Sequence, residues 1–479
     1  MANGPALERP RAPDHPDPGE EMSVHVVVVG AGISGVAATR DLTTQGASVT
    51  VLEARDRVGG QLHAVDVDGT PVDVGAEALF TAAPEPLDLI TELGLDDEVV
   101  DAERGTTWIA SERGLRPLPA GFGPAGPTRL WPMVTSRVLS PLGMVRAGLE
   151  PLVPAARSDA DVSVGGYLGR RFGRQLTEQL VDPLLGGLHS GDVGRLSLKA
   201  ATPQLAALAD RHRSLLLRRR SKPPSGPAFV SLRGGLASLP SRLLRSLDGV
   251  EVRLASTVAA IEPAPGTRSR VHTVDGVTLD ADAVVVALPA AAAGRVVAAS
   301  SPSAAAELAR LRTASVAVAV LAFPGVAAAT PALAGTGLLV PSGQGYLLKA
   351  ATFLSSKWPH HADQGRVLIR ASAGRAGDDR ATALDDDELV QRLVDELRAL
   401  TGLCEDPTHV RVHRWPSTMP QLEVGHHQRL ERATGALRRD LPGVVLAGAP
   451  YHGPGLSACI RSGARAADRI IDHLEERAT

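Results

Sequence analysis

The sequence predicts a mixed α/β (α+β) protein that contains a doubly wound sheet, a second mixed sheet and a mostly helical region. Residues 23–53 show the pattern strand, glycine turn, helix and strand, which is a βαβ unit. Residues 82–217 show a mostly helical pattern, strand patterns resume at residue 229, and the chain ends in another strand, glycine loop and helix. A length of 479 residues corresponds to about three domains.

The individual elements follow from hydrophobic periodicity and turn signals. VDVDGTPVDVG, residues 65–75, predicts a hairpin around Asp68-Gly69. Within the helical region, residues 87–93 and 166–180 are the most amphipathic stretches. The later elements are expected, in order, as a strand at 229–232, a helix ending at 246, a strand pair at 250–263, a hairpin from 271 that ends in an apolar strand at 283–288, a strand at 315–323, a helix at 386–400, and the closing strand, loop and helix at 444–472.

Composition excludes several classes of protein. Fifty basic and 53 acidic side chains give a net charge of −3, which excludes the electrostatic signature of a nucleic-acid-binding protein. Two cysteines, Cys404 and Cys459, cannot form a disulfide framework and have no zinc-ligand spacing. We therefore expect no metal site and a cytoplasmic location. Only 3% of residues are aromatic, so the core is expected to consist of Ala, Val and Leu.

Three segments could be mistaken for targeting or membrane signals. Residues 1–22 contain five prolines and no apolar stretch, so we expect a disordered tail rather than a signal peptide. Residues 313–348 are uncharged, but prolines and glycines divide them into pieces shorter than a membrane span. The basic cluster at 211–222 is interpreted as a solvated helix end, with contact to an acidic membrane surface as the alternative.

The first chemical motif is a glycine loop with G-x-G-x-x-G spacing between a strand and a helix. Gly30 permits the tight turn, Gly32 lets the backbone approach a pyrophosphate, and Gly35 allows close helix packing. Glu53 lies 18 positions after Gly35, at the end of the second strand, where its carboxylate can accept hydrogen bonds from ribose hydroxyls. The motif therefore predicts a dinucleotide site.

A second motif distinguishes between nucleotides. Residues 53–61 read EARDRVGGQ, in which Arg57 precedes the glycine pair Gly59-Gly60. Glycine exposes backbone donors and arginine supplies a charge-assisted fork, so this segment can bind a second part of a pyrophosphate. The pattern resembles the E-A-x-x-R-x-G-G signature of FAD-dependent amine-oxidase-like flavoproteins, which implies FAD rather than NAD.

Five further stretches narrow this resemblance. The sequences at 181–205, 229–240, 352–360, 414–430 and 451–463 are similar, in the same order, to motifs of the oxygen-dependent porphyrinogen oxidases of heme synthesis. The resemblance covers nearly all of residues 24–475 and implies a Rossmann-like FAD-binding domain, a mixed-sheet substrate domain and a helical domain. The implied ranges are 23–80, 225–300 and 436–479 for the FAD-binding domain, 81–104 and 301–435 for the substrate domain, and 105–224 for the helical domain.

The resemblance also implies the site residues. The positions carried over are Gly30, Gly32, Ile33, Ser34, Gly35, Glu53, Ala54, Arg57, Gly60, Gly75, Ala76, Glu77, Ala78, Val258, Trp415, Gly455, Leu456 and Ser457. Val258 is expected near the adenine, and Trp415 and residues 455–457 near the flavin ring, although Trp415 could equally fill the core. No catalytic side chain is assigned, because the chemistry belongs to the flavin.

The implied activity is oxidation of coproporphyrinogen III to coproporphyrin III, with molecular oxygen as acceptor and hydrogen peroxide as product. Hydride would leave a meso carbon for flavin N5, in three flavin turnovers per porphyrin. The implied partners are the porphyrinogen, oxygen, a ferrochelatase that receives the product and, peripherally, the membrane. The alternatives are protoporphyrinogen IX oxidase, an amine oxidase or desaturase of the same superfamily, and a flavin- or porphyrin-binding protein without turnover.

The chain departs from the family pattern at residues 75–84. Where the family has a serine followed by a basic residue, this chain has Ala78 and Ala83, so the residues that hold the substrate propionates are not evident. Lys349, Arg370 and Arg375 could pair with propionates or cap strand ends in solvent. The histidines near glycine loops are expected to be structural rather than catalytic bases; they are His63, His189 and His452.

Overall fold

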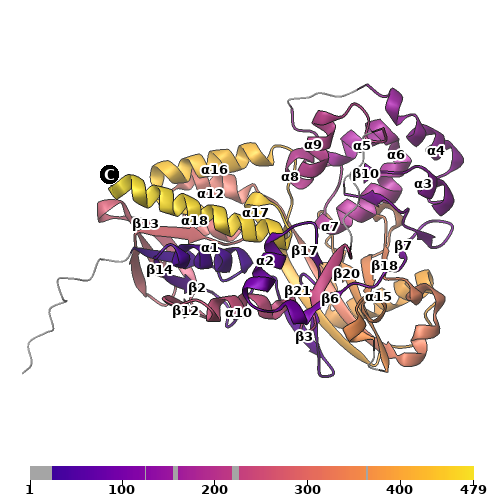
Figure 1. The fold of residues 1–479 in the computed structure, drawn as a ribbon, viewed down its shortest axis with the longest axis horizontal. Helices are drawn as coiled ribbons and strands as arrows, with labels where there is room; N and C mark the ends of the chain where they lie inside the picture. Colours follow the sequence, from indigo (N-terminus) through magenta and orange to yellow (C-terminus); the bar gives the residue numbers. More distant parts are fainter. Residues whose placement is uncertain (1–23, 125, 155–159, 218–225, 363–364, 479) are drawn as a thin grey trace, which may run out of the picture.

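The computed structural model describes residues 24–124, 126–154, 160–217, 226–362 and 365–478. The predicted tail at 1–22 and part of the basic cluster, 218–222, lie outside these residues. Figure 1 shows three regions: a parallel sheet with long helices, a second sheet beside it, and a group of short helices next to that second sheet. In the described residues, no helix is both long and apolar enough to cross a bilayer.

A five-stranded parallel sheet forms the first region, with strand order β12-β2-β1-β16-β22. Alternate valines of β1 point to opposite faces, so that Val26 and Val28 join one core cluster and Val27 and Val29 the other. The strands are β1 (His25–Val29), β2 (Ser48–Leu52), β12 (Val250–Arg253), β16 (Ala283–Val286) and β22 (Val444–Leu446).

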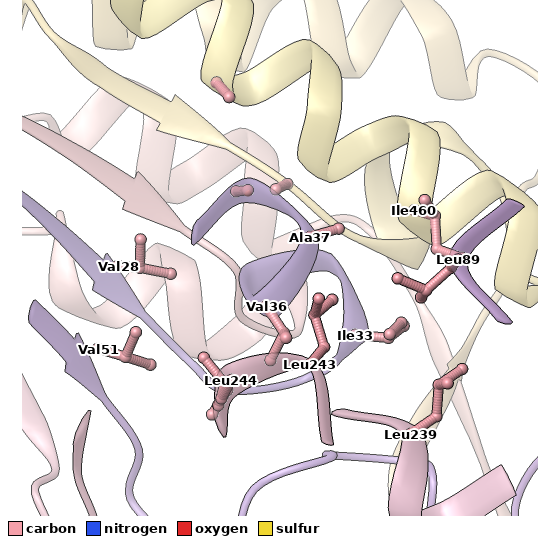
Figure 2. Packing of buried hydrophobic residues seen from close by; sticks show 14 of the residues in the cluster. Val28, Ile33, Val36, Ala37, Val51, Leu89, Leu239, Leu243, Leu244 and Ile460 are labelled. Carbon is pink, nitrogen blue, oxygen red and sulfur yellow. The ribbon is translucent and has the colours of Figure 1, made fainter. Parts of the chain in front are cut away.

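Helices and a small antiparallel sheet cover the two faces. Figure 2 shows one face, where Val36 of α1 and Leu244 of α10 lie over the sheet valines Val28 and Val51, and Ile460 of α18 lies beside Leu89 of α2. That face is covered by α1 (Ile33–Thr44), α2 (Glu85–Glu92), α10 (Leu239–Arg245) and α18 (Leu456–Ala478). The other face is covered by β13 (Val258–Ala264), β14 (Arg268–Thr273), β15 (Thr278–Ala281), α11 (Ala290–Val296), α12 (Pro302–Ala309) and α16 (His426–Asp440).

A seven-stranded mixed sheet forms the second region, in the order β21-β17-β20-β19-β18-β7-β8. Its strands are β7 (Thr107–Ile109), β8 (Arg116–Pro117), β17 (Thr313–Pro324), β18 (Gly337–Leu339), β19 (Leu348–Phe353), β20 (Arg366–Ala373) and β21 (His409–Pro420). Alternate side chains of β17 point to opposite faces of this sheet. Those on one face pack in a cluster with α15 (Asp386–Thr401), and those on the other face pack around Trp358 and Trp415. The hairpin β3 (Ala64–Val67) and β4 (Thr70–Asp73) packs on the second of these clusters.

Short helices around one apolar cluster form the third region. They are α3 (Trp131–Ser136), α4 (Pro141–Gly148), α5 (Val164–Phe172), α6 (Arg174–Leu176), the π-helix η3 (Thr177–Gly186), α7 (Gly187–His189), α8 (Leu198–Ala201) and α9 (Pro203–Arg211). The amphipathic stretch at 166–180 is therefore not one helix. It breaks at Gly173, whose φ of 96° is incompatible with a continuing right-handed helix.

The helical prediction for residues 82–217 holds at α2 but is wrong at residues 99–127. Residues 99–127 contain short strands, because they pair with distant segments: Thr107–Ile109 aligns with β18, and Val99–Asp101 (β6) aligns with β11 (Phe229–Leu232). The remaining short strands are β5 (Leu79–Phe80), β9 (Phe122–Gly123) and β10 (Gly126–Pro127). Residues 250–263 form two strands as predicted, but these do not pair with each other: β12 joins the parallel sheet beside β2, and β13 pairs with β14. The other predicted elements are confirmed within a few residues, and the division into domains stays a prediction.

Candidate active site

The first glycine loop lies at the carboxyl edge of the parallel sheet, directly before α1. Gly30 has φ of 102° and donates its N–H to the carbonyl of Leu52 at 2.7 Å. A Cβ on Gly35 would lie 2.0 Å from the Gly30 carbonyl oxygen, whereas a Cβ on Gly32 would meet only the Cα of Gly60, at 4.0 Å. Gly30 and Gly35 are thus required by turn and packing, and Gly32 leaves room for a ligand.

Glu53 connects the end of β2 to this loop. Its side chain is 8% exposed and accepts hydrogen bonds from the N–H groups of Ala31 and Arg55, each at 2.9 Å. A carboxylate has about four acceptor positions, so two contacts leave capacity for ribose hydroxyls. The neighbouring Ala54 is exposed. Glu53 therefore supports the loop and can also bind a nucleotide.

The second glycine pair faces the first loop. Gly59 donates its N–H to the carbonyl of Ala31 at 2.8 Å, and a Cβ on Gly60 would lie 3.0 Å from the Cα of Gly32. Arg57 donates to the carbonyl of Gly60 at 3.0 Å. Burial, with help from a neighbouring arginine, lowers the pKa of the Arg57 guanidinium. Two opposed glycine loops beside a helix N-terminus, with a carboxylate at the strand end, fit a dinucleotide.

A turn at residues 75–78 lies next to the glycine pair. A Cβ on Gly75 would lie 1.7 Å from the carbonyl oxygen of Gln61, so only glycine fits. Glu77 forms ion pairs with Lys357 at 2.7 Å and Arg370 at 3.2 Å. Burial alone would raise the pKa of Glu77, but the two cations outweigh burial and lower it. Arg370 also donates to the carbonyls of Val74 and Gly75.

The sequence patterns single out Glu77 and Arg370 separately and include Lys357 in a matched stretch, but they do not predict that the three form one ion-pair group. Ala76 and Ala78 are half-buried beside Glu77. Lys357 belongs to the KWPH stretch at residues 357–360, a pattern that assigns no role to any single side chain. Arg370 was considered as a propionate partner; the structure instead pairs it with Glu77. The group fixes the turn at 75–78 against the second sheet.

Two further predicted residues, Trp415 and Val258, lie on β21 and β13, next to the loops described above. Trp415 on β21 is 5% exposed and donates its indole N–H to the carbonyl of Val74 at 3.0 Å. Val258 begins β13, and the preceding Ser256 donates its N–H to the carbonyl of Glu53 at 2.8 Å. Trp415 therefore fills core space beneath the turn at 75–78, and the start of β13 lies beside the nucleotide end of the site.

Residues 455–457 reach the site through the packing of α18 on α1. Gly455 has φ of 105°, and Leu456 begins α18. Ile33 and Ser34 occupy the first turn of α1, and a Cβ on Gly463 would lie 2.4 Å from the carbonyl oxygen of Ser34. Nearer to the start of α18, the side chain of Cys459 contacts that of Ser34, and the N–H of Cys459 bonds the carbonyl of Gly455 at 3.0 Å. Gly455, Leu456 and Ser457 therefore lie within about one helical turn of a residue that contacts the N-terminal end of α1. The structure thus brings together predicted residues from both ends of the chain.

The histidines considered as bases have structural environments. Burial lowers the pKa of His189 to about 4, and burial together with nearby arginines lowers that of His452 to about 4. His452 bonds the Ser462 hydroxyl at 2.8 Å. His63 packs against His413, with ring centroids 4.8 Å apart. Such weakly basic side chains are poor proton acceptors at neutral pH.

Comparison with known proteins identifies the family. Residues 33–471 match the family described as flavin containing amine oxidoreductase. The chain belongs to this family. Membership implies a flavin cofactor, in agreement with the opposed glycine loops. Coproporphyrinogen III oxidase of Bacillus subtilis (strain 168) is 31% identical, over 94% of this chain and 98% of its own length. The enzyme of the same name from Propionibacterium freudenreichii subsp. freudenreichii is 34% identical, over 95% and 92%.

Solved structures agree with this assignment. A structure from Exiguobacterium sp. 255-15 has a TM-score of 0.83 and 30% identity, covering 95% of this chain and 99% of that chain. Cyclohexylamine oxidase from Brevibacterium oxydans IH-35A has a TM-score of 0.69 at 20% identity, covering 95% and 100%, which shows a shared fold. The predicted resemblance to the porphyrinogen oxidases and the predicted fold class are confirmed.

Proposed function

We propose that this chain is an FAD-dependent oxidase that converts coproporphyrinogen III to coproporphyrin III, with oxygen as electron acceptor. The observation that carries the proposal is nearly full-length identity of 29–34% to bacterial relatives of that name. The two opposed glycine loops support a dinucleotide form of the flavin, because a mononucleotide has no pyrophosphate for them to hold. A protoporphyrinogen IX oxidase is the second candidate, since Protoporphyrinogen oxidase 2 of Arabidopsis thaliana is 28% identical over 94% of this chain.

The flavin cradle consists of the two glycine loops (residues 30–35 and 59–60), Glu53, Arg57, Val258, the turn at 75–78, Trp415 and residues 455–457, and each part has a defined task in this proposal. The Gly30–Gly35 loop and the first turn of α1 bind the pyrophosphate through backbone N–H groups. Glu53 accepts from a ribose hydroxyl, and Val258 borders the adenine. Arg57 and Gly60 hold the second glycine loop against the first. Trp415 and the Gly75–Ala78 turn support the redox end opposite residues 455–457.

The reaction removes six hydrogens from the porphyrinogen in three two-electron steps, and three oxygen molecules leave as three hydrogen peroxide molecules. When bound, FAD supplies the hydride acceptor. The protein orients the substrate. The proton released from a pyrrole nitrogen goes to water or to a weak base. Aromatisation of the product drives this step without a strong base.

An aerobic assay tests this function. Purified holoprotein is given coproporphyrinogen III or protoporphyrinogen IX, and porphyrin fluorescence, oxygen uptake and peroxide are followed. We expect coproporphyrin III to accumulate with three peroxides for each porphyrin. Oxidation of protoporphyrinogen alone would favour the second candidate. Flavin-loaded protein that oxidises neither compound would indicate a binding protein without turnover.

We also propose a cytoplasmic enzyme that touches the membrane peripherally and passes its product to a ferrochelatase. Both cysteines are free thiols, which fits a reducing compartment. Three large apolar side chains on and after α3 and α4 are strongly exposed: Trp131 (74%), Leu142 (78%) and Leu152 (75%). Exposed apolar groups on neighbouring helices are typical of interaction surfaces. The hand-off to a ferrochelatase rests on the chemistry of the product, a metal-free porphyrin.

The membrane contact gives a testable prediction. The triple variant Trp131→Ser, Leu142→Ser, Leu152→Ser should bind phosphatidylglycerol vesicles at least about 10-fold more weakly than the wild type, because each buried apolar side chain contributes about 1.5–3 kcal/mol. Co-sedimentation measures the effect. The matched control is Val274→Ser with Val326→Ser, two side chains exposed elsewhere (70% and 66%). Wild-type protein that stays in the supernatant would contradict membrane contact.

A further inference from the structure

A buried lysine and a half-buried arginine lie where the second sheet meets the helical region. Lys349 is 6% exposed, and its Nζ donates to the hydroxyl of Ser190 at 2.5 Å. Arg375 is half-buried and donates through Nη2 to the carbonyl of Val340 at 2.6 Å. Its buried Nη1 has no hydrogen-bond partner in the described part of the chain. Both groups therefore bond only neutral oxygens.

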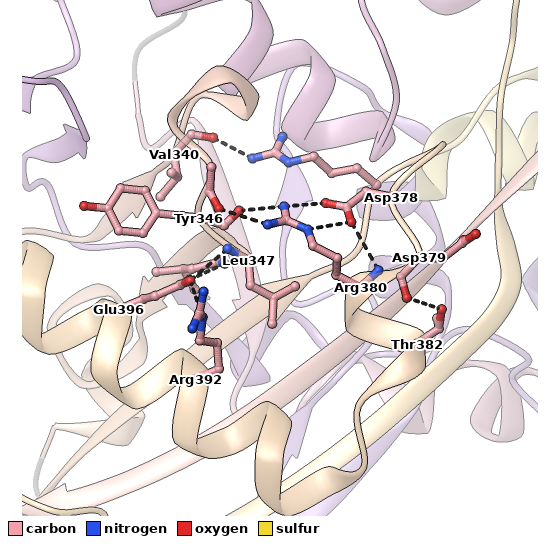
Figure 3. Close-up of polar contacts among 12 residues, drawn as sticks. Val340, Tyr346, Leu347, Asp378, Asp379, Arg380, Thr382, Arg392 and Glu396 are labelled. Carbon is pink, nitrogen blue, oxygen red and sulfur yellow. Dashed lines mark hydrogen bonds and ion pairs between the residues drawn. The ribbon is translucent and has the colours of Figure 1, made fainter.

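The nearby carboxylates are already engaged. Figure 3 shows Asp378 bound by Arg380, and Glu396 bound by Arg392 and the Leu347 backbone. Asp182 accepts the N–H of Ser342 at 2.7 Å. Across the described residues, no carboxylate oxygen lies within 4 Å of Lys349 Nζ or of the Arg375 guanidinium. Asp182 and Asp378 attract Arg375 from beyond ion-pair distance, whereas the charges that act on Lys349 are the repelling arginines Arg375 and Arg370. A buried ammonium group without a counterion is unfavourable, so the surroundings of Lys349 are suited to an anionic group of a ligand.

The backbone directs the Lys349 side chain toward Ser190. In the pairing of β19 with β20, Leu348 faces Ala373 and Ala350 faces Ser372, which leaves Lys349 as the extra residue of a β-bulge. Such bulges redirect a side chain and occur often beside active sites. Ser190 adopts a left-handed conformation with φ of 49°, which a non-glycine residue maintains at some energetic cost.

A chain of hydrogen bonds connects this pair to the flavin cradle. Gln421 donates to the carbonyl of His189, the residue before Ser190, at 2.9 Å. Gln421 directly follows β21, the strand that carries Trp415. Three residues earlier, the carbonyl of Thr418 accepts from the Gln61 side chain at 3.1 Å, beside the second glycine pair. The cations thus lie at the same end of the sheet as the predicted flavin ring.

We propose that Lys349, assisted by Arg375, binds one propionate carboxylate of the porphyrinogen. This inference rests on the proposed function. It assigns to another strand the cationic role that the sequence lacks at Ala83. Arg370 does not share this role, because Glu77 already holds it. Lys349 is a positioning residue for the substrate, since the contact lies at the periphery of the macrocycle rather than at the carbon that is oxidised.

The test compares Lys349→Met with wild type and with Lys349→Arg. We expect Lys349→Met to weaken binding of coproporphyrin III to the holoenzyme by about 10- to 100-fold, because a charge-assisted hydrogen bond is lost. The KM for coproporphyrinogen should rise with little change in kcat. Coproporphyrin III tetramethyl ester, which has no carboxylates, should bind all three proteins equally, and Lys349→Arg should recover most of the affinity. The matched control is Lys199→Met, at an exposed lysine of α8.

The outcomes separate this inference from the proposed function. Equal affinity of wild type and Lys349→Met for coproporphyrin III, with wild-type turnover intact, would overturn the role of Lys349 and leave the oxidase standing. Failure of the wild type to oxidise or bind either porphyrin would overturn the proposed function and this inference with it. Flavin content and melting temperature of each variant show that it is folded; if Lys349→Met fails to fold, Ser190→Ala replaces it, with a smaller rise in KM expected.

The pH dependence of KM gives a second prediction. Burial, with repulsion from Arg375 and Arg370, lowers the pKa of Lys349 to about 7; His189 and Asp182 also face this region. Only the protonated amine attracts a carboxylate, so the wild-type KM should be lowest below pH 7 and should rise above it. Lys349→Arg stays charged and should show a flat KM from pH 6 to pH 9. A rise of equal size in both proteins would exclude Lys349 as the titrating group.

Discussion

Replacement of Glu53 by alanine is expected to give purified protein that carries much less flavin than the wild type. The carboxylate accepts the N–H groups of Ala31 and Arg55 at 2.9 Å, so its removal leaves both donors without that partner as well as removing a ribose contact. A hydrogen bond to a charged group contributes about 1.5–3 kcal/mol. We therefore expect flavin affinity to fall by about 10- to 100-fold, with the loss measured as reduced visible absorbance of the bound flavin in the purified protein.

A control separates loss of flavin from loss of folding. Glu112→Ala removes an exposed carboxylate in a turn of the second sheet, and it should retain wild-type flavin content. Glu53→Gln keeps the size of the side chain but turns one acceptor into a donor, so it should be intermediate. Circular dichroism checks that each variant is folded. A Glu53→Ala protein with wild-type flavin content would show that the ribose is bound elsewhere.

The sequence was sufficient to predict the two glycine loops of the cradle, because the conformation of these loops depends on residues that are close together in the chain. Gly30 needs a positive φ, and Gly35 lies against Gly30, so the spacing alone determines which positions must be glycine. Both glycines belong to one βαβ unit, whose turn is determined by residues close in the chain. The second glycine pair is only about two dozen residues further on, and its pattern was equally readable.

Strand pairs and ion pairs between residues far apart in the chain could not be predicted from the sequence in the same way. Thr107–Ile109 lies in a segment with a helical pattern, but it becomes β7 because the edge of β18, more than 200 residues later, is available to it. The partners of Glu77 lie about 280 and 293 residues away, and the bulge that redirects Lys349 depends on its alignment with β20. Local periodicity contains no information about such alignments.

The second large effect is expected in the helical region, where Glu150 and Arg171 form a buried ion pair. Glu150 is fully buried and Arg171 is 2% exposed, with Arg171 Nε 2.6 Å from Glu150 Oε1. Glu150 also accepts the Ser214 hydroxyl and the N–H of Leu215. Arg171→Met would leave a buried carboxylate without its cation, which costs about 3–5 kcal/mol. Amide hydrogen exchange in α5 should accelerate by at least about 100-fold.

The pH dependence of this variant identifies the cause. In the wild type, burial alone would raise the pKa of Glu150, but bonds from Ser214, Leu215 and Arg171 outweigh burial and lower it. Without Arg171 the balance shifts toward burial, which raises the pKa in the folded state. A carboxyl group whose pKa is raised in the folded state stabilises the fold at low pH, and this stabilisation is lost as the pH rises. The loss of unfolding free energy in Arg171→Met should therefore be smaller at pH 5 than at pH 8.

The exposed pair Arg174–Glu178 provides the matched control. Arg174→Met should change the free energy of unfolding by less than about 0.5 kcal/mol. An Arg171→Met deficit that is small, or independent of pH, would mean that Ser214 and the Leu215 amide are enough to stabilise the buried carboxylate.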